Sequence, residues 1–584
     1  MNKPRVILGI NTNHADSSAC ILIDGKIIAA IEEERINRIK HFSGNPIESI
    51  KECLNIANLK ANEITDIAFN TRPLNNIVPK FLFLLKNFNF KKNSTINRFK
   101  KKINIKSFLF KNFKLNKDVK FHYVEHHLAH IASAFYPSEF KDAFGLSIDG
   151  SGDFVTFALA ECKNNKIDIK KKIFFPNSLG IFYHGMTQFL GFKNYGDEYK
   201  IMGLAAYGVP IYFDKILGNL FKNRKDGIFE LNLKYFNHHR YDFQYISNEN
   251  LVIGQIYNDE LLILFKDEIN QHPNKEKFTK DFASSVQKVY EFFFEKILNN
   301  LINNNFSKNL VYAGGCALNS SANRLLTNSK NDFNKIYIPF APGDNGGALG
   351  SAFVVANKLN NKLTNIKTPY LGKSFKNKYI KEVLDSDTYK NKLVYNFIND
   401  DDEFLHKTAT FISDGNVVGW FQGEMEFGPR ALGNRSILAD PRNSQMKKII
   451  NMKIKRRESF RPFAPSVLKE FQDDWFESDF NNPYMSSLAT VKKNKQIIIP
   501  AVTHIDNTAR LQTVTKETNL RFNNLLKFFY KLTGVPILLN TSFNENEPIV
   551  MKPEEALNCI LRTDMDAVFM NNFIITKKFK NIKF

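Results

Sequence analysis

A pattern of strand, polar turn and strand occurs twice in the first 160 residues, and it restricts the fold more than any other feature of the sequence. The first copy joins Leu8–Ile10 to the apolar run 19–31, and the second joins Phe144–Asp149 to Val155–Ala160. Short apolar runs on either side of a tight polar turn are typical of β-hairpins. Nucleotide-binding folds with two pseudo-symmetric halves begin with such duplicated hairpins, each followed by helical sequence. We therefore expect an α/β fold with duplicated halves.

The chain of 584 residues is too long for a single hydrophobic core, because domains usually hold about 100 to 200 residues. A polar stretch at 357–378 contains a proline and a glycine, and a second series of strands and helices follows it. Such a stretch is typical of a domain boundary. We expect one domain at 1–370 and a second α/β domain at 371–584.

Composition limits the compartment and the partners. No apolar run approaches the roughly 20 residues of a membrane span, and Val6–Ile10 is shorter than a signal-peptide core of about 7 to 15 residues. The five cysteines are scattered and include no C-x-x-C pair, which favours a reducing, cytoplasmic location. The net charge of +22 accompanies the abundant Asn, Lys, Ile and Phe that an AT-rich genome favours. We therefore expect no specific nucleic-acid partner, because charge alone indicates non-specific association.

A basic, phenylalanine-rich segment occupies about 80–120 and contains neither glycine nor proline from Phe81 onward. Two interpretations are open. In the first, inserted amphipathic helices pack their phenylalanines and leucines and expose their lysines to water. In the second, the segment is a platform for an anionic acceptor or for weak contact with an anionic membrane, which would include a lipid-linked acceptor.

Two histidines of the stretch 125–135 have the spacing of metal ligands. The stretch lacks a helix breaker, so it is predicted to be helical. Residues four apart share a helix face, so His126 and His130 would point the same way and could hold one metal ion, whereas His127 would face elsewhere. The alternative is a pair of helical histidines that make ordinary hydrogen bonds.

Two aspartates, Asp149 and Asp344, follow strands at glycine-rich turns, where α/β folds display ligand groups. Together with two imidazoles they would suit a borderline divalent ion such as iron, manganese or zinc, with open positions for a ligand. The neighbouring glycines would let backbone amides approach a phosphate or nucleotide. These glycines are Gly150, Gly152, Gly314, Gly315, Gly343, Gly346 and Gly347.

The second domain places arginines beside glycine and proline, in 426–436, 440–442 and 455–465. A guanidinium binds phosphate oxygens through two parallel hydrogen bonds, so several together would hold a triphosphate or a phosphorylated donor. A surface of salt bridges is the alternative. The segment 540–544 would add hydroxyl and amide donors at a strand end.

Six motifs, at 13–19, 125–130, 196–205, 428–433, 460–465 and 540–544, resemble in order those of the O-carbamoyltransferases that modify nodulation factors, aminoglycosides and cephem antibiotics. The resemblance covers nearly the whole chain. It implies an N-terminal domain similar to the tRNA threonylcarbamoyltransferases, with the actin-like, sugar-kinase-like duplicated (ASKHA) fold. It also implies a C-terminal domain similar to the YrdC-like adenylate synthases.

The resemblance further implies two reactions. The C-terminal domain would form carbamoyl-adenylate from carbamoyl phosphate and ATP, with Mg²⁺ bound to ATP. The N-terminal domain would transfer the carbamoyl group to a hydroxyl of a sugar, glycan or secondary metabolite and release AMP, with a divalent metal, Fe²⁺ foremost, gripping the adenylate phosphate. His14 would be the general base, because a neutral imidazole accepts protons near neutral pH.

The site residues that this resemblance implies fall into three groups. The metal ligands would be His126, His130, Asp149 and Asp344. The catalytic residues would be His14, Asp16, Arg430, Lys455 and Ser542. The substrate and nucleotide contacts would be Gly150, Gly152, Asp153, Lys200, Gly314, Gly315, Asn319, Gly343, Arg435, Arg442, Arg457, Arg461 and Arg510.

Two other activities are compatible with part of the pattern. A tRNA threonylcarbamoyl-transferring enzyme with a fused activating domain would suit the net charge of +22. A sugar kinase of the same N-terminal fold would release ADP. The chain also departs from the family at Thr71–Pro73, where an arginine replaces the lysine of a common Lys-Pro pair, and the two cations are not interchangeable at a bidentate site. No motif identifies the acceptor or the oligomeric state.

Overall fold

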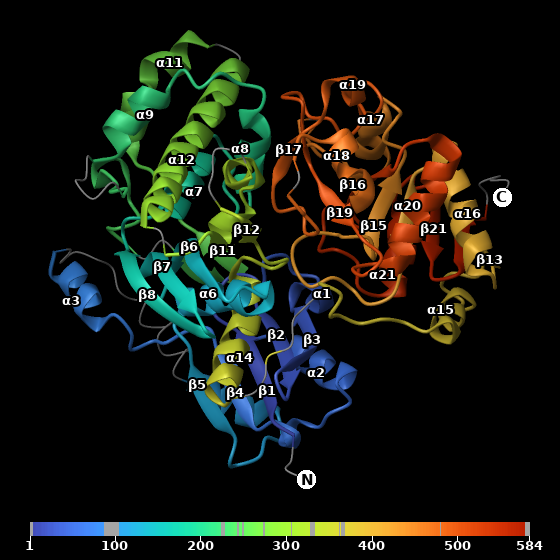
Figure 1. The fold of residues 1–584 in the computed structure, drawn as a ribbon, viewed down its shortest axis with the longest axis horizontal. Coiled ribbons are helices and arrows are strands. Elements are labelled where there is room, and N and C mark those ends of the chain that lie inside the picture. The colour runs from blue at the N-terminus through green and yellow to red at the C-terminus, as the bar shows by residue number, and fades with distance from the viewer. Residues whose placement is uncertain are drawn as a thin grey trace. The chain divides into compact units, whose positions relative to one another are not determined.

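The computed structural model has a mixed α/β fold in two compact units, unit 1 (1–366) and unit 2 (367–584), which are described separately (Figure 1). The division falls within the polar stretch 357–378. The structure describes residues 4–86, 104–222, 228–241, 244–247, 250–272, 275–304, 306–327, 333–360, 363, 368–458, 460–478 and 480–578.

Unit 1 contains two five-stranded sheets with the same strand order and the same strand directions. In the first sheet the order is β3-β2-β1-β4-β5, in which β1, β2 and β3 are antiparallel and β4 and β5 run parallel to β1. In the second the order is β12-β11-β6-β7-β8, with β6 in the place of β1. The duplicated halves predicted from the two hairpins are therefore confirmed.

The bounds of these strands place each predicted hairpin at the start of its sheet. The first sheet consists of β1 (Val6–Asn11), β2 (Ser18–Ile23), β3 (Lys26–Glu32), β4 (Asp66–Phe69) and β5 (Lys120–Tyr123). The second consists of β6 (Asp142–Gly152), β7 (Val155–Lys163), β8 (Lys166–Phe174), β11 (Asn309–Ala313) and β12 (Lys335–Tyr337).

Two helices cross between the halves. Helix α6 (His126–Phe135) follows β5 of the first sheet but packs against β6 and β11 of the second, and α14 (Gly347–Lys358) follows β12 but packs against β1 and β4 of the first (Figure 1). The two helices also contact each other. Their close approach requires Gly350, because a Cβ atom there would lie 1.8 Å from the carbonyl oxygen of Ala129. This exchange brings the starts of both helices to the ends of β1 and β6.

The second half of unit 1 carries a largely helical region whose phenylalanines form its core. Its long helix, α12 (Glu276–Asn304), packs against α7 (Leu179–Phe189), α8 (Glu198–Ala205) and α9 (Phe213–Leu220). The Phe282 ring lies 4.9 Å from that of Phe189, and both are surrounded by further aromatic rings. Many of the abundant phenylalanines thus pack in the interior.

The basic segment contains two described helices that behave differently. Helix α5 (Ile105–Asn112) buries Ile105 and Leu109 against the first sheet and exposes its lysines, as the first interpretation predicts. Helix α3 (Ile77–Lys86) buries only Phe83. Residues 87–103 lie outside the described part of the chain. Within the described ranges, every helix is too short or too polar to cross a bilayer.

Unit 2 is built on one eight-stranded mixed sheet with the order β13-β22-β21-β14-β15-β20-β16-β19. Helices α16 (Asp401–Ser413) and α20 (Leu520–Thr533) pack against each other and against this sheet, and α21 (Pro553–Arg562) packs against β14 and β21. The strands are β13 (Leu393–Phe397), β14 (Val418–Phe421), β15 (Arg435–Ala439), β16 (Ala464–Leu468), β19 (Gln512–Val514), β20 (Ile537–Ser542), β21 (Ala567–Met570) and β22 (Phe573–Lys577).

Candidate functional site

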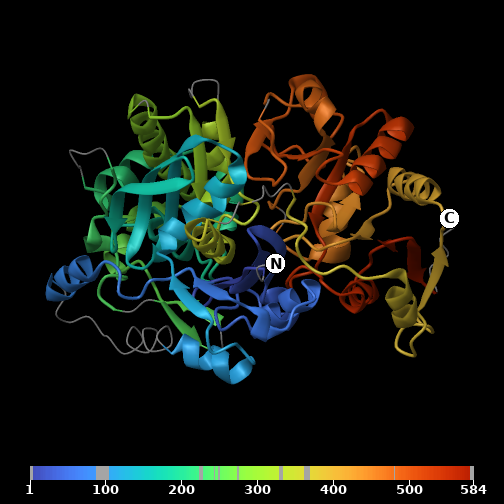
Figure 2. The same ribbon diagram turned by 60° about the horizontal axis from the view of Figure 1, so that its bottom comes forward.

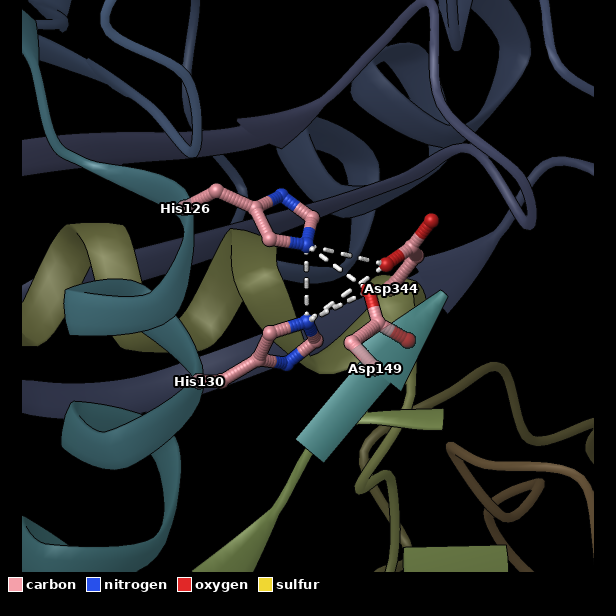
Figure 3. Close-up of side chains that lie close together, drawn as sticks. All are labelled: His126, His130, Asp149 and Asp344. Atoms are coloured by element: carbon pink, nitrogen blue, oxygen red, sulfur yellow. Dashed lines mark hydrogen bonds and ion pairs between the residues drawn. The ribbon is translucent and has the colours of Figure 1, made fainter. Parts of the chain in front are cut away.

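The four predicted metal ligands lie together in the interior of unit 1 (Figure 3). His126 and His130 come from successive turns of α6, Asp149 from β6, and Asp344 from the 3₁₀ turn η6 (Asp344–Gly346) that precedes α14. We call these four residues the His/Asp cluster. Their ligand atoms, two imidazole Nε2 and two carboxylate oxygens, all lie within 4.8 Å of one another.

Distances within the His/Asp cluster fit a shared cation. The Nε2 atoms of His126 and His130 are 2.9 Å apart. His126 Nε2 lies 3.2 Å from Asp149 Oδ2 and 3.4 Å from Asp344 Oδ1, and His130 Nε2 lies 3.7 and 3.5 Å from the same oxygens. Two ligands about 2.0–2.1 Å from one ion are roughly 2.9–3.4 Å apart at ordinary coordination angles. The two nitrogens and two oxygens suit a borderline divalent ion.

The cluster is electrostatically balanced even without a cation. Burial opposes the charged form of His126, but the facing carboxylates of Asp149 and Asp344 prevail and raise its pKa to about 10. The pKa of His130 is raised in the same way. Burial also opposes ionisation of Asp149, yet the two histidines hold its pKa well below the usual range. A bound metal would take the place of the imidazole protons.

Backbone contacts orient the ligands. The Gly315 amide donates to Asp149 Oδ1 at 2.9 Å, which leaves Oδ2 facing the histidines. The backbone of Gly152 packs closely against the ring of His126. A Cβ atom at this position would be 2.0 Å from the ring, so a larger residue would displace it. Two of the predicted glycines therefore support the cluster directly.

Asp153 and Asn345 fix the segments that carry the ligands. The Asp153 carboxylate accepts hydrogen bonds from the Thr71 hydroxyl and the Arg72 amide, both at 2.7 Å, and from the His126 amide at 3.1 Å, at the start of α6. Asn345, next to Asp344, donates to Glu32 at 3.1 Å. Asp153 is predicted to contact substrate, and in the structure its carboxylate binds the start of α6.

His14 lies beside the His/Asp cluster, buried in the loop that follows β1. Its ring centroid is 4.8 Å from that of His126. This position is next to the proposed metal, as a base acting on a bound acceptor would need to be. His127 faces away, as the helical spacing predicts: its two ring nitrogens contact Ser147 Oγ and the Val155 carbonyl, and burial lowers its pKa to about 3.

Asp16, the other predicted catalytic residue of this loop, contacts a histidine that the sequence analysis did not single out. Its Oδ1 lies 2.8 Å from His41 Nδ1. Burial opposes protonation of His41, but Asp16 and Glu34 raise its pKa to about 9. The Tyr195 ring packs edge-on against His41 at 5.2 Å, and Gly196 leaves room for His41 Nε2. No local pattern links these residues, because they are far apart in the sequence.

The remaining predicted contacts of unit 1 have structural partners. Gly314 has a φ of 93°, and a Cβ atom there would lie 2.3 Å from the Ile148 carbonyl oxygen. Lys200 pairs with Asp197 at 2.9 Å. Asn319 accepts from the Ala322 amide and pairs with the Gln287 amide group. Gly343 directly precedes η6, and Gly150 borders open space.

In unit 2, Glu426 organises the loop that carries Arg430. Its Oε1 accepts hydrogen bonds from the amides of Leu432, Asn434 and Arg435 at 2.8, 2.8 and 3.2 Å. The carbonyls of this loop are held as well, with Gly433 accepting from the Trp420 indole at 2.8 Å. Arg430 is therefore presented from a loop with a fixed conformation. The sequence analysis quoted Glu426 but assigned it no role.

Five cations of unit 2 interact with one another, and we call them the cationic cluster. They are Arg430, Lys455, Arg457, Arg461 and Arg510. Burial, followed by the charges of Arg430, Arg457 and Arg461, holds the pKa of Arg510 well below its usual range. Burial and the charge of Arg457 lower the pKa of Lys455. Burial lowers the pKa of Arg430 to about 10.

The guanidinium groups of Arg430 and Arg510 have neither a hydrogen bond nor a carboxylate partner among the residues that the structure describes. Lys455 is held in place by the end of β20: its Nζ donates to the Ser542 carbonyl at 2.5 Å and to Asn544 Oδ1 at 2.7 Å, and lies 3.3 Å from Ser542 Oγ. Half-buried like charges without a carboxylate partner, as Arg430 and Arg510 are, favour the binding of an anion. The predicted Ser542 lies beside them.

Two predicted phosphate ligands lie elsewhere. Arg435 is fully buried, and its guanidinium donates to the carbonyls of Gln422, Asn434, Lys373 and Gly423. Arg442 forms a bidentate pair with Asp440 at 3.0 and 2.6 Å. Arg435 supports the fold, and Arg442 has its own counterion, so neither joins the cationic cluster.

His504 is a residue near the cationic cluster that sequence reasoning missed. Burial lowers its pKa to about 4, with Asp506 acting in the opposite direction and Arg510 in the same one. Its Nδ1 contacts Thr508 Oγ1 at 3.1 Å, and its Nε2 is buried without a hydrogen-bond partner in the described ranges. A lone histidine in a loop carries no sequence signal for this position.

Comparisons with known proteins cover both units. A family model described as carbamoyltransferase N-terminus matches residues 6–353, and one described as carbamoyltransferase C-terminus matches 409–577. Nodulation protein NolNO of Sinorhizobium fredii is 34% identical over 590 residues, which cover 97% of this chain and 80% of that protein. An uncharacterized protein of Synechocystis is 39% identical over 98% of this chain and 96% of its own length. The crystal structure of HypF from T. kodakarensis is 14% identical with a TM-score of 0.31, over 61% of this chain and 48% of its own.

Proposed function

The chain belongs to the carbamoyltransferase family, and we propose that it is an ATP-dependent O-carbamoyltransferase with an activation site in unit 2 and a transfer site in unit 1. The observation that carries this proposal is the opposite character of two clusters. Unit 2 gathers five cations, of which Arg430 and Arg510 have no carboxylate partner in the described ranges, as suits a polyphosphate substrate, and unit 1 gathers potential metal ligands beside a histidine.

In the activation step, the cationic cluster would hold carbamoyl phosphate and the triphosphate of ATP. One water is needed for the atoms to balance: carbamoyl phosphate releases phosphate, and a carbamate oxygen then displaces pyrophosphate from the α-phosphorus. Arg430 and Arg510 would stabilise the charge on the α-phosphate of ATP during the displacement, because their guanidinium groups lack competing carboxylates and other hydrogen-bond partners in the described ranges. Lys455 and Ser542 would contact the same group from the end of β20.

In the transfer step, an acceptor hydroxyl would attack the carbamoyl carbon, and the bond from this carbon to the AMP oxygen would break. His14 would take the hydroxyl proton, since its ring borders the His/Asp cluster. His126, His130, Asp149 and Asp344 would hold a divalent metal, which when bound supplies a Lewis acid for the departing phosphate. Gly315 and Gly152 would keep two of these ligands oriented.

The acceptor would be a sugar, a glycan or another small hydroxyl compound. A nodulation protein among the relatives supports this class over tRNA. The YrdC-like assignment of unit 2 remains a prediction.

Isotope exchange between ATP and pyrophosphate tests the proposal in the full-length protein. We expect exchange that depends on carbamoyl phosphate and needs no acceptor, followed by AMP release when an acceptor is added. The His14→Asn variant should keep the exchange and lose the transfer. Release of ADP would indicate a kinase, and exchange that is independent of carbamoyl phosphate would contradict the activation step.

A further inference from the structure

Helix α3 presents large apolar side chains to solvent. Leu74, just before the helix, and Ile77, Val78, Phe81, Leu82, Leu84 and Leu85 within it are 36–68% exposed. At 100° per residue, these side chains occupy an arc of roughly 160° around the helix. Lys86 borders this arc on one side. The buried Phe83 lies on the opposite side, where the helix meets the rest of unit 1.

The segment around α3 is strongly and exclusively basic. Residues 67–117 contain 13 lysines and arginines and no aspartate or glutamate, whereas the whole chain has a net charge of +22. More than half of the net charge therefore lies in 51 of the 584 residues. A composition bias that acts on the whole genome does not explain this concentration. Residues 87–103 lie outside the described part of the chain. They enter this count through their sequence charges alone, and nothing is inferred about their structure.

Lysines near α5 add exposed positive charge to the same segment. Lys111, Lys114 and Lys117 are exposed and make no ion pair among the described residues, and Phe110 is 43% exposed beside them. The segment 67–117 thus combines exposed apolar side chains with cations and contains no acidic residue.

We propose that unit 1 docks on an anionic lipid bilayer through α3. A helix of ten residues is too short to span a bilayer but long enough to lie in its interface, with the apolar arc among the acyl chains and the lysines at the anionic headgroups. The width of the arc favours a bilayer over a protein groove, since a groove covers a narrower stripe of a helix. The absence of acidic residues over 67–117 favours an anionic surface.

The docking helix contacts the turn that follows β6, the strand that supplies Asp149 of the His/Asp cluster. The Phe83 ring lies 5.6 Å from that of Phe154 and 5.3 Å from that of Phe175. Asn76 donates to the Asp153 carbonyl at 3.0 Å. Both Phe154 and Asp153 directly follow the strand β6, which supplies Asp149. Figures 1 and 2 show α3 at the margin of unit 1, with its outer side uncovered by other described elements.

Co-sedimentation of the full-length protein with lipid vesicles tests this proposal without nucleotide or acceptor, so its result does not depend on the proposed function. We expect binding to vesicles of phosphatidylcholine with phosphatidylglycerol and at least 10-fold weaker binding to phosphatidylcholine alone. The triple variant Val78→Ser, Phe81→Ser, Leu85→Ser should weaken binding to the anionic vesicles by at least 10-fold. The variant Lys111→Glu, Lys114→Glu, Lys117→Glu should weaken it as well, and added salt should do the same.

Two matched variants provide the controls. Val209, Ile211 and Ile263 are equally exposed in unit 1 but lie outside the basic segment, so their replacement by serine should leave vesicle binding unchanged. Replacement of the exposed Lys376, Lys378 and Lys493 by glutamate should have a smaller effect than the α5 variant. Equal sedimentation of the wild type and the α3 variant would overturn the proposal. So would a wild type that ignores anionic vesicles but self-associates through α3.

Discussion

The His/Asp cluster of unit 1 is largely buried and the cationic cluster of unit 2 is partly buried around Lys455, and their charges are arranged in opposite ways. In the first, two imidazoles face two carboxylates, and each pair supports the charge of the other. In the second, burial and the charges of Arg430, Arg457 and Arg461 lower the pKa of Arg510, burial and the charge of Arg457 lower that of Lys455, and Arg430 and Arg510 have no carboxylate partner in the described ranges. The charges of the first cluster offset one another, whereas those of the second repel one another, and a bound anion would relieve this repulsion. We therefore expect the second cluster to depend more strongly on its ligand.

The largest expected effect comes from removing one of the uncompensated cations. We expect Arg510→Met to slow carbamoyl-dependent pyrophosphate exchange by about 10³-fold, because a fixed donor to the transferring phosphate is lost. The thermal stability of the ligand-free protein should stay the same or rise, because repulsion is removed. Arg435→Met is the control: it removes four hydrogen bonds to backbone carbonyls, which should cost about 4 kcal/mol at about 1 kcal/mol each. If Arg510→Met and Arg435→Met lower the unfolding temperature equally, Arg510 supports the fold as much as Arg435 does, and the distinction between them is wrong.

Removal of a charge from the His/Asp cluster should impair carbamoyl transfer and spare pyrophosphate exchange. The Asp344→Asn variant should lose its divalent metal, measured by mass spectrometry of the metal content, and should transfer carbamoyl groups about 10³-fold more slowly. It should retain pyrophosphate exchange, because that reaction belongs to unit 2. Asp385→Asn, which removes an exposed carboxylate paired with Lys381, should change neither. Loss of exchange in Asp344→Asn would show that the two sites are not separate.

A smaller effect is expected when a metal-coordinating side chain is displaced but not removed. In Gly152→Ala the new methyl group would lie 2.0 Å from the His126 ring, so the ring must move. We expect the metal affinity to fall roughly 10- to 100-fold, as it does when the support of a metal ligand is disturbed. Gly150→Ala is a close control, because a Cβ atom there meets nothing within 4 Å. An unchanged affinity in Gly152→Ala would place the metal away from His126.

The smallest expected effects are the numbers of protons released or taken up when a ligand binds. Their signs should differ between the two clusters. The pKa of His126 is raised to about 10 in the folded, metal-free protein, so its contribution to stability is complete below pH 6.5 and is lost as the pH rises through 10. Metal must displace this proton, and its affinity should rise by up to about 10-fold per pH unit for each proton released. The pKa of Lys455 is lowered, so protonation costs stability, and a bound anion should cause proton uptake.

Calorimetry in buffers of different ionisation enthalpy measures these signs. We expect proton release when Mn²⁺ binds at pH 8 and proton uptake when tripolyphosphate binds at pH 9. Proton exchange of the same sign in both titrations would remove the proposed contrast.

Sequence reasoning succeeded where short-range rules apply. The two hairpins follow from apolar runs and turn residues, and they do begin the two sheets of unit 1. The helical spacing of His126 and His130, and the glycine turns after the strands that precede Asp149 and Asp344, depend on only a few residues each. Those side chains meet because both turns lie at the ends of strands in a duplicated fold.

Sequence patterns do not separate residues that share a local context but differ in their tertiary surroundings. Arg430 and Arg435 lie five positions apart in one motif, yet one faces the cationic cluster and the other donates to four buried carbonyls. Helices α3 and α5 belong to one basic, phenylalanine-rich segment, but only α5 packs its apolar face. Asp16 and His41 pair through a contact that no periodicity predicts.

The sequence by itself determined the duplicated architecture, the family and the four residues of the His/Asp cluster, because periodicity, turn chemistry and motif order are properties of neighbouring residues. The tertiary structure decided which arginines join the cationic cluster and which bind backbone carbonyls or a carboxylate, and it brought His41 to Asp16. It also crossed α6 and α14 onto opposite sheets, so that His126 meets Asp344. Burial and charge pairing decide these points, and both depend on residues that are distant in the chain.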